Sequence, residues 1–78
     1  MISEEMANEI VGWRCNELVK LPAVRRIMKA MHREGKSLQE IKDHVIHMAI
    51  STFIGKPYQE VTHEEMSLLR PSFDGRTV

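Results

Sequence analysis

The sequence lacks the features of secreted and membrane proteins. It contains one cysteine, Cys15, so no disulfide can form within the chain. Its longest strongly apolar run, residues 45–54, is about half as long as a membrane span and contains His47. No amino-terminal stretch combines basic residues with a long apolar segment, as a signal peptide does. These absences predict a cytoplasmic protein in a reducing environment, without membrane insertion.

The chain also lacks an excess of charge of either sign, because its 11 basic and 11 acidic residues give a formal net charge of zero. Its apolar fraction of 42% and its charged fraction of 28% are typical of soluble globular proteins. A chain of 78 residues is short enough for one domain, which buries only roughly 60 to 65% of its unfolded surface. We therefore expect a single folded domain over residues 1–78.

Motifs for catalysis are missing as well. The sequence contains no dinucleotide-binding glycine motif, phosphate-binding loop or nucleophile elbow. His44 and His47 are three residues apart and could project from one helix, but a metal site needs further ligands. The other candidate ligands, Cys15, His32 and His63, lie on separate predicted elements. We therefore expect no enzymatic activity, no metal and no cofactor.

Capping signals indicate two helices in the first half of the chain. Ser3 can cap a helix with its hydroxyl, and the acidic residues that follow it suit the positive end of the helix dipole, which predicts a helix over about 4–19. Pro22 suits the opening turn of a second helix, and Gly35 suits its left-handed exit. We predict this second helix over about 22–34.

Two capping boxes indicate two more helices. Ser37 with Glu40, and Thr62 with Glu65, have the spacing at which each side chain bonds the other residue's backbone N–H. We predict a third helix over about 38–54, a short fourth helix over about 63–69, and a tail over 71–78. The predicted fold is all-α, a compact bundle of three main helices plus a short fourth C-terminal helix.

Residues 45–54 are the ambiguous segment, because their β-branched and aromatic side chains would also suit a strand. The capping box and the helical spacing of Leu38, Ile41, Val45 and Met48 favour a helix. A helix that is apolar on nearly every side must be enclosed. Either the other helices of the chain or a second subunit would cover it, so a homo-oligomer is an open alternative.

The charges are unevenly distributed along the chain. Residues 1–19 carry a net charge of −3, residues 20–36 carry +5, residues 37–56 carry none, and residues 57–78 carry −2. The basic segment therefore lies between two acidic ones.

The predicted second helix is amphipathic. At 100° per residue, its cations fall within roughly a third of the circumference, and its larger apolar residues gather on the opposing arc. We call the first group the cationic stripe: Arg25, Arg26, Lys29, Arg33 and Lys36. The opposing arc holds Val24, Ile27, Met28 and Met31. The stripe either keeps one side of an ordinary helix solvated or binds an anionic partner.

One stretch resembles a DNA-binding motif. Residues 33–45, REGKSLQEIKDHV, look like the entry into the first helix of a helix-turn-helix unit, where a glycine precedes a capped helix. The last of these 13 residues begins the apolar run 45–54, where that family has a tight turn and a polar recognition helix. The resemblance therefore assigns no functional residue here. It defines the alternative function, a nucleic-acid-binding transcriptional regulator.

The function that the sequence favours is protein binding without catalysis. We expect a small interaction or regulatory domain, of the kind found as bacterial or phage accessory factors, that binds and modulates a larger protein through its basic helix. The candidate partner-binding residues are Arg25, Arg26, Lys29, Arg33, Lys36, Trp13 and Tyr58.

The two aromatic candidates each have a structural alternative. Trp13 shares a helical face with Met6 and Ile10, which favours a core position over an exposed anchor. Tyr58 follows a proline in a predicted loop, where its ring could instead seal the underside of the core.

Overall fold

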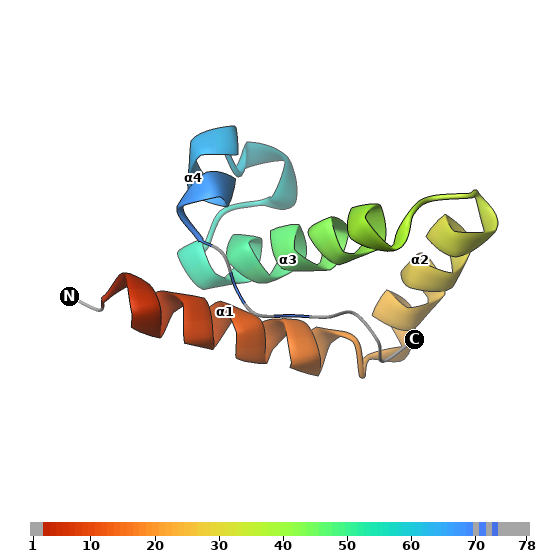
Figure 1. The fold of residues 1–78 in the computed structure, drawn as a ribbon, viewed down its shortest axis with the longest axis horizontal. Coiled ribbons are helices and arrows are strands. Elements are labelled where there is room, and N and C mark those ends of the chain that lie inside the picture. The colour runs from red at the N-terminus through yellow and green to blue at the C-terminus, as the bar shows by residue number, and fades with distance from the viewer. Residues whose placement is uncertain (1–2, 70, 72, 74–78) are drawn as a thin grey trace.

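The computed structural model describes residues 3–69, 71 and 73, and they form an all-α bundle of three main helices and a short fourth (Figure 1). The helices are α1 (Glu4–Leu18), α2 (Pro22–Arg33), α3 (Leu38–Ile54) and α4 (His63–Leu68). The predicted bounds of all four helices are confirmed to within one residue. One element was not predicted, a 3-10 turn η1 (Tyr58–Glu60) between α3 and α4.

The predicted caps begin the helices. The Ser3 hydroxyl accepts a hydrogen bond from the backbone N–H of Met6 at the start of α1. Both capping boxes are formed, Ser37 with Glu40 before α3 and Thr62 with Glu65 before α4. In each box two backbone donors that a helix leaves unpaired are satisfied within four residues of sequence. Local sequence therefore accounts for where these helices begin.

Two glycines allow the chain to leave α2 and α3. Gly35 has a φ of +83° and Gly55 has a φ of +75°, both in the left-handed region that glycine adopts without steric cost. The Gly35 turn leads from α2 directly into the cap of α3, and the Gly55 turn leads from α3 towards η1.

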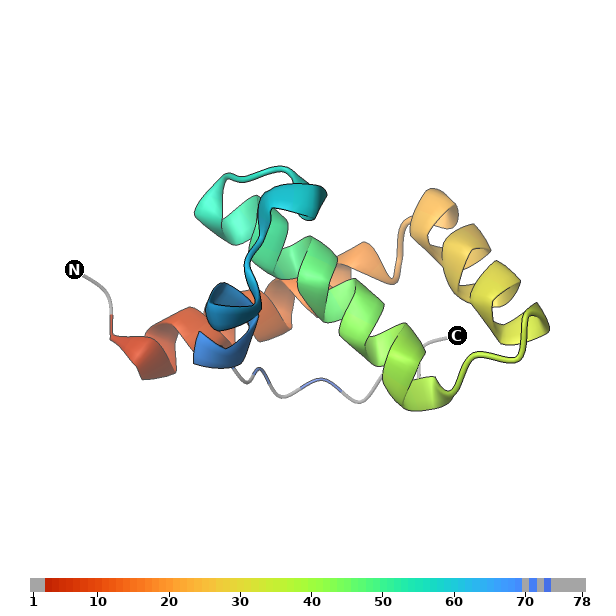
Figure 2. The same cartoon turned by 90° about the horizontal axis from the view of Figure 1, so that it is seen from above.

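Helix α3 forms the centre of the bundle. It packs against α1 on one side, while η1 and α4 lie on the other side, and α2 lies beside one end of α3 (Figures 1 and 2). Residues from these elements and from the C-terminal tail form one buried core: Val11, Cys15, Val19, Val24, Met28, Ile41, Val45, Ala49, Ile50 and Phe73. Within the described part of the chain, no helix has the length and apolarity needed to cross a membrane.

The ambiguous segment 45–54 is helical, so the strand alternative is wrong. Val45, Ala49 and Ile50 are fully buried. Other apolar residues of the segment are partly buried against the same core, namely Ile46, Met48, Phe53 and Ile54. Other parts of the same chain therefore cover much of this apolar helix.

The predicted tail 71–78 contains a core residue that the sequence did not indicate. Phe73 is 7% exposed and belongs to the core cluster, and Pro71 is half-buried. The predicted tail is therefore packed into the core at residue 73. Residues 72 and 74–78 of the tail lie outside the described residues.

Candidate protein-interaction surface

One face of α2 anchors this helix to the bundle. Val24 is 6% exposed and Met28 is fully buried, and Met31 is partly buried against the same core. Ile27, the fourth residue of the predicted apolar arc, is 41% exposed and lies at the edge of this contact. The opposite face of α2 is consequently turned away from the core.

That opposite face carries four residues of the cationic stripe, Arg25, Arg26, Lys29 and Arg33, all of them exposed. Lys36 was predicted on the same face, but it follows α2 after the left-handed Gly35, and it is also exposed. The ion pairs among the described residues join Lys20 to Glu17 and Lys56 to Glu65. Four cations of the stripe take part in no ion pair with a described residue: Arg26, Lys29, Arg33 and Lys36. The chain's own described carboxylates thus leave these four charges available to another molecule.

Three cations of the stripe form a row along α2. Arg26, Lys29 and Arg33 follow one another at spacings of three and four residues, so they lie along one line of the helix. With a rise of about 1.5 Å per residue, Arg26 and Arg33 are about 10.5 Å apart along the axis. The Nε–H of Arg26 donates to the Pro22 carbonyl at 3.4 Å, which uses one of the five guanidinium donors. No other hydrogen bond joins this guanidinium to a described residue.

The structure places Trp13 on the surface, so the core interpretation of this residue is wrong. Its side chain is 62% exposed, and Met6, two turns earlier on the same face of α1, is 50% exposed. The residues of α1 that face the core are smaller, namely Ala7, Val11, Gly12 and Cys15. Trp13 is on α1 and the stripe follows α2, so these candidate residues come from two different helices.

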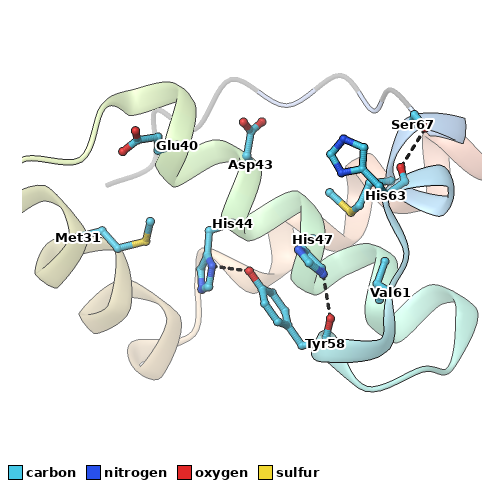
Figure 3. Close-up of a pocket in the computed structure, with 10 residues that line it drawn as sticks. Met31, Glu40, Asp43, His44, His47, Tyr58, Val61, His63 and Ser67 are labelled. Atoms are coloured by element: carbon cyan, nitrogen blue, oxygen red, sulfur yellow. Dashed lines mark hydrogen bonds between the residues drawn. The ribbon is translucent and has the colours of Figure 1, made fainter.

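Tyr58 is held by two histidines of α3 (Figure 3). Its hydroxyl lies 2.8 Å from Nδ1 of His44, and its carbonyl oxygen lies 2.9 Å from Nε2 of His47. The rings of Tyr58 and His47 stack with their centroids 3.7 Å apart and their planes 16° apart. The half-buried Tyr58 therefore fastens η1 to α3, as in the sealing alternative, and its binding of a partner stays a prediction.

These three residues line an open cavity of about 550 Å³ between α3, α4, η1 and the inner face of α2. Glu40 and Asp43 lie towards one end and His63 and Ser67 towards the other, as Figure 3 shows. No group of three or more histidine, cysteine or acidic residues is arranged to hold a metal ion in the part of the chain that the structure describes.

The environment of the cavity shifts the pKa values of two side chains. Burial lowers the pKa of His44, and the neighbouring His47 lowers it further because two positive charges repel. Burial also raises the pKa of the Tyr58 hydroxyl. At neutral pH the hydrogen bond therefore joins a neutral phenol to a neutral imidazole. The sequence shows only that two histidines share a helical face, and it does not show that Tyr58 meets them.

Comparison of the chain with protein-family models, with curated protein sequences and with solved structures found no match.

Proposed function

We propose that this chain is a small, non-enzymatic, cytoplasmic interaction protein that binds a larger protein and modulates it by covering part of its surface. The binding surface is the cationic stripe of α2, and the partner presents acidic side chains to it. The observation that carries the proposal is the exposed row of Arg26, Lys29 and Arg33, which form no ion pair with a described carboxylate, on a helix whose other face is fixed by Met28.

Exposed apolar side chains that are close to the stripe in the sequence support a protein partner. Leu21, Ile27 and Leu38 are 50%, 41% and 56% exposed, and they lie before, within and after α2. Protein interfaces combine apolar contacts with arginine in this way, whereas nucleic-acid interfaces are dominated by positive charge. Burial of three such side chains by a partner would add to the charge attraction and would weaken little in salt.

The features expected of a nucleic-acid binder are weaker. The net charge of the chain is zero, where such domains have a basic excess. Helix α3 continues unbroken from Leu38 to Ile54, so the segment that resembles a helix-turn-helix entry runs on as helix where that family has a tight turn and a recognition helix. Nucleic acid is the alternative partner, and the experiment must distinguish it from a protein.

The test compares proteins captured by immobilised wild-type chain and by two variants from an extract of the source cells treated with nuclease. Arg26→Gln/Arg33→Gln removes two stripe charges, and Lys42→Gln/Lys56→Gln removes two charges from α3 and the turn after it. Glutamine keeps helix propensity, so circular dichroism should be unchanged for both. We expect a protein that the wild type and the control retain and that the stripe variant loses; a capture profile identical for all three would contradict the proposal.

A gel-shift series with a generic duplex and a single strand at low salt tests the alternative. Binding through several phosphates weakens steeply as salt rises. A shift that depends on Arg26 and Arg33 and disappears with added salt, together with no protein lost from the stripe variant, would assign the stripe to nucleic acid instead.

A further inference from the structure

The outer face of α1 is a second surface that the proposed function does not use. Trp13 and Met6, both at least half exposed, lie on it at helical spacing. A tryptophan with 62% of its surface in water exposes a large apolar area, and tryptophan is enriched among the residues that contribute most to protein interfaces. Because Ala7, Val11 and Cys15 face the core, this face of α1 points away from the bundle.

Acidic residues flank the tryptophan. Glu9 lies one turn before Trp13 and Glu17 lies one turn after it, and both are exposed. Glu17 is paired with Lys20 at 2.9 Å, but both side chains are largely in water, at 67% exposure for the lysine and 46% for the glutamate. Such exposed pairs contribute about 0–1 kcal/mol, so exchanging Lys20 for another cation costs little.

The charges on the outer faces of α1 and α2 are opposite in sign and similar in spacing. Glu9 and Glu17 are eight residues apart, about 12 Å along the axis, and Arg26 and Arg33 are seven residues apart, about 10.5 Å. When the two arginines meet the two glutamates, Lys29 lies near the middle of the pair, opposite Trp13. A cation over an indole ring is attracted by its π electrons, in addition to the charge pairs.

We propose that a second copy of this chain binds here, with its cationic stripe on the Glu9–Trp13–Glu17 face of α1. Both surfaces point away from the core of their own chain, so the contact forms between chains. A net charge of zero adds no long-range repulsion between copies. The inference rests on the proposed function in one respect: both assign the stripe as a docking surface, so self-association competes with partner binding.

The first measurement is sedimentation from about 5 to about 500 µM, the range expected for a small interface. We expect the average mass to rise from 9.1 kDa towards at least twice that value. Trp13 is the single tryptophan, so a blue shift of its fluorescence over the same range reports burial of this face. A constant mass of 9.1 kDa at every concentration would overturn the inference.

Charge reversal identifies the two surfaces. Glu9→Lys/Glu17→Lys makes the α1 face basic, and Arg26→Glu/Arg33→Glu makes the stripe acidic, so each variant alone should associate at least about tenfold more weakly than the wild type. An equal mixture should recover association, because each reversed surface then meets one of opposite charge. Recovery on mixing cannot come from misfolding of either variant.

Matched controls change the same charge elsewhere. Glu60→Lys/Glu64→Lys alters η1 and α4, which lie on the other side of α3 from α1 (Figure 1), and should associate as the wild type does. Self-association that survives both reversals would overturn the inference. A monomeric wild type that still captures a protein through the stripe removes this inference and keeps the proposed function. Self-association that depends on the stripe, without any captured protein, keeps this inference and removes the proposed function.

Discussion

The Tyr58 hydroxyl lies 2.8 Å from Nδ1 of His44, a contact between residues that are 14 positions apart in the sequence. The Tyr58 carbonyl lies 2.9 Å from Nε2 of His47, and because a carbonyl only accepts, the proton of that bond belongs to Nε2. One residue of η1 thereby engages two histidines on successive turns of α3. This contact holds the connection to α4 against the central helix.

Two substitutions of Tyr58 distinguish the contribution of its hydroxyl to stability from the contribution of its ring. Tyr58→Phe removes the bond to His44 but keeps the stack on His47, so the free energy of unfolding should fall by about 0.5–1.5 kcal/mol. Tyr58→Ala removes both contacts and should cost more. Urea denaturation measures both variants, and Gln59→Ala at an exposed neighbouring position should change stability by less than about 0.5 kcal/mol. If Tyr58→Ala were as stable as the wild type, the ring would contribute nothing.

His44 makes the stability of the fold depend on pH. Its pKa in the folded chain is lowered by burial and by His47, so the unfolded chain, with a histidine pKa of about 6.5, binds the proton first as the pH falls. The stabilising contribution is therefore complete above about pH 6.5 and is lost as the pH falls through the folded pKa. Denaturation at a series of pH values should show this loss in the wild type.

His44→Gln is the control for this pH effect, because glutamine does not titrate. The variant should lose less stability on acidification than the wild type. His47→Gln removes the secondary cause of the shift and should move the His44 titration, followed by the ring NMR signals, to higher pH. Equal pH dependence of the wild type and His44→Gln would show that other groups are responsible.

Helix boundaries could be predicted from the sequence because their causes are local. The box of Ser37 and Glu40 is complete within four residues, and the left-handed Gly55 ends α3 without a distant contact. The contact between Tyr58 and His44 is different, because it depends on how the chain returns after α3. Nothing in the residues near Tyr58 specifies that return, so the sequence left two interpretations of the ring.

The position of Trp13 shows why the orientation of α1 was harder to predict. This helix has two apolar faces, one with Met6, Ile10 and Trp13 and one with Ala7, Val11 and Cys15. Size alone favours burial of the first, which gives more hydrophobic stabilisation per residue. The second is the face that packs against α3, where Ala49 is also fully buried, and small side chains permit close packing of two helices. Packing between helices determines which face of α1 is buried, and the helical periodicity of the sequence could not predict it.

Cys15 should be almost unreactive in the folded chain. It is fully buried in the contact with α3, and burial raises its pKa to about 11, so the reactive thiolate is scarce at neutral pH. Labelling with a disulfide reagent at pH 7.5 should proceed at least about 100-fold more slowly than in denaturant, because it requires opening of the fold. Equal rates in the two conditions would contradict the packing of α1 on α3.

Met28 should control whether the stripe is presented as a rigid row. It is fully buried, and with Val24 it holds α2 against the core, so Met28→Ala should cost about 2–5 kcal/mol of stability. Ile27→Ala, one residue earlier at 41% exposure, should cost less than about 1 kcal/mol. Denaturation measures both costs, and amide hydrogen exchange should show faster opening in α2 for Met28→Ala than for Ile27→Ala.

The variants Met28→Ala and Ile27→Ala also distinguish the effect of an ordered α2 on partner capture from the effect of its charge. Met28→Ala leaves every stripe cation in place, so weaker capture of an acidic partner by this variant would come from loss of the ordered row. Capture should recover in part in a stabilising osmolyte, because the osmolyte favours the folded state and adds no charge. If capture stays at the wild-type level while hydrogen exchange shows α2 open, recognition needs only the charges, and the regular spacing of Arg26, Lys29 and Arg33 has no part in it.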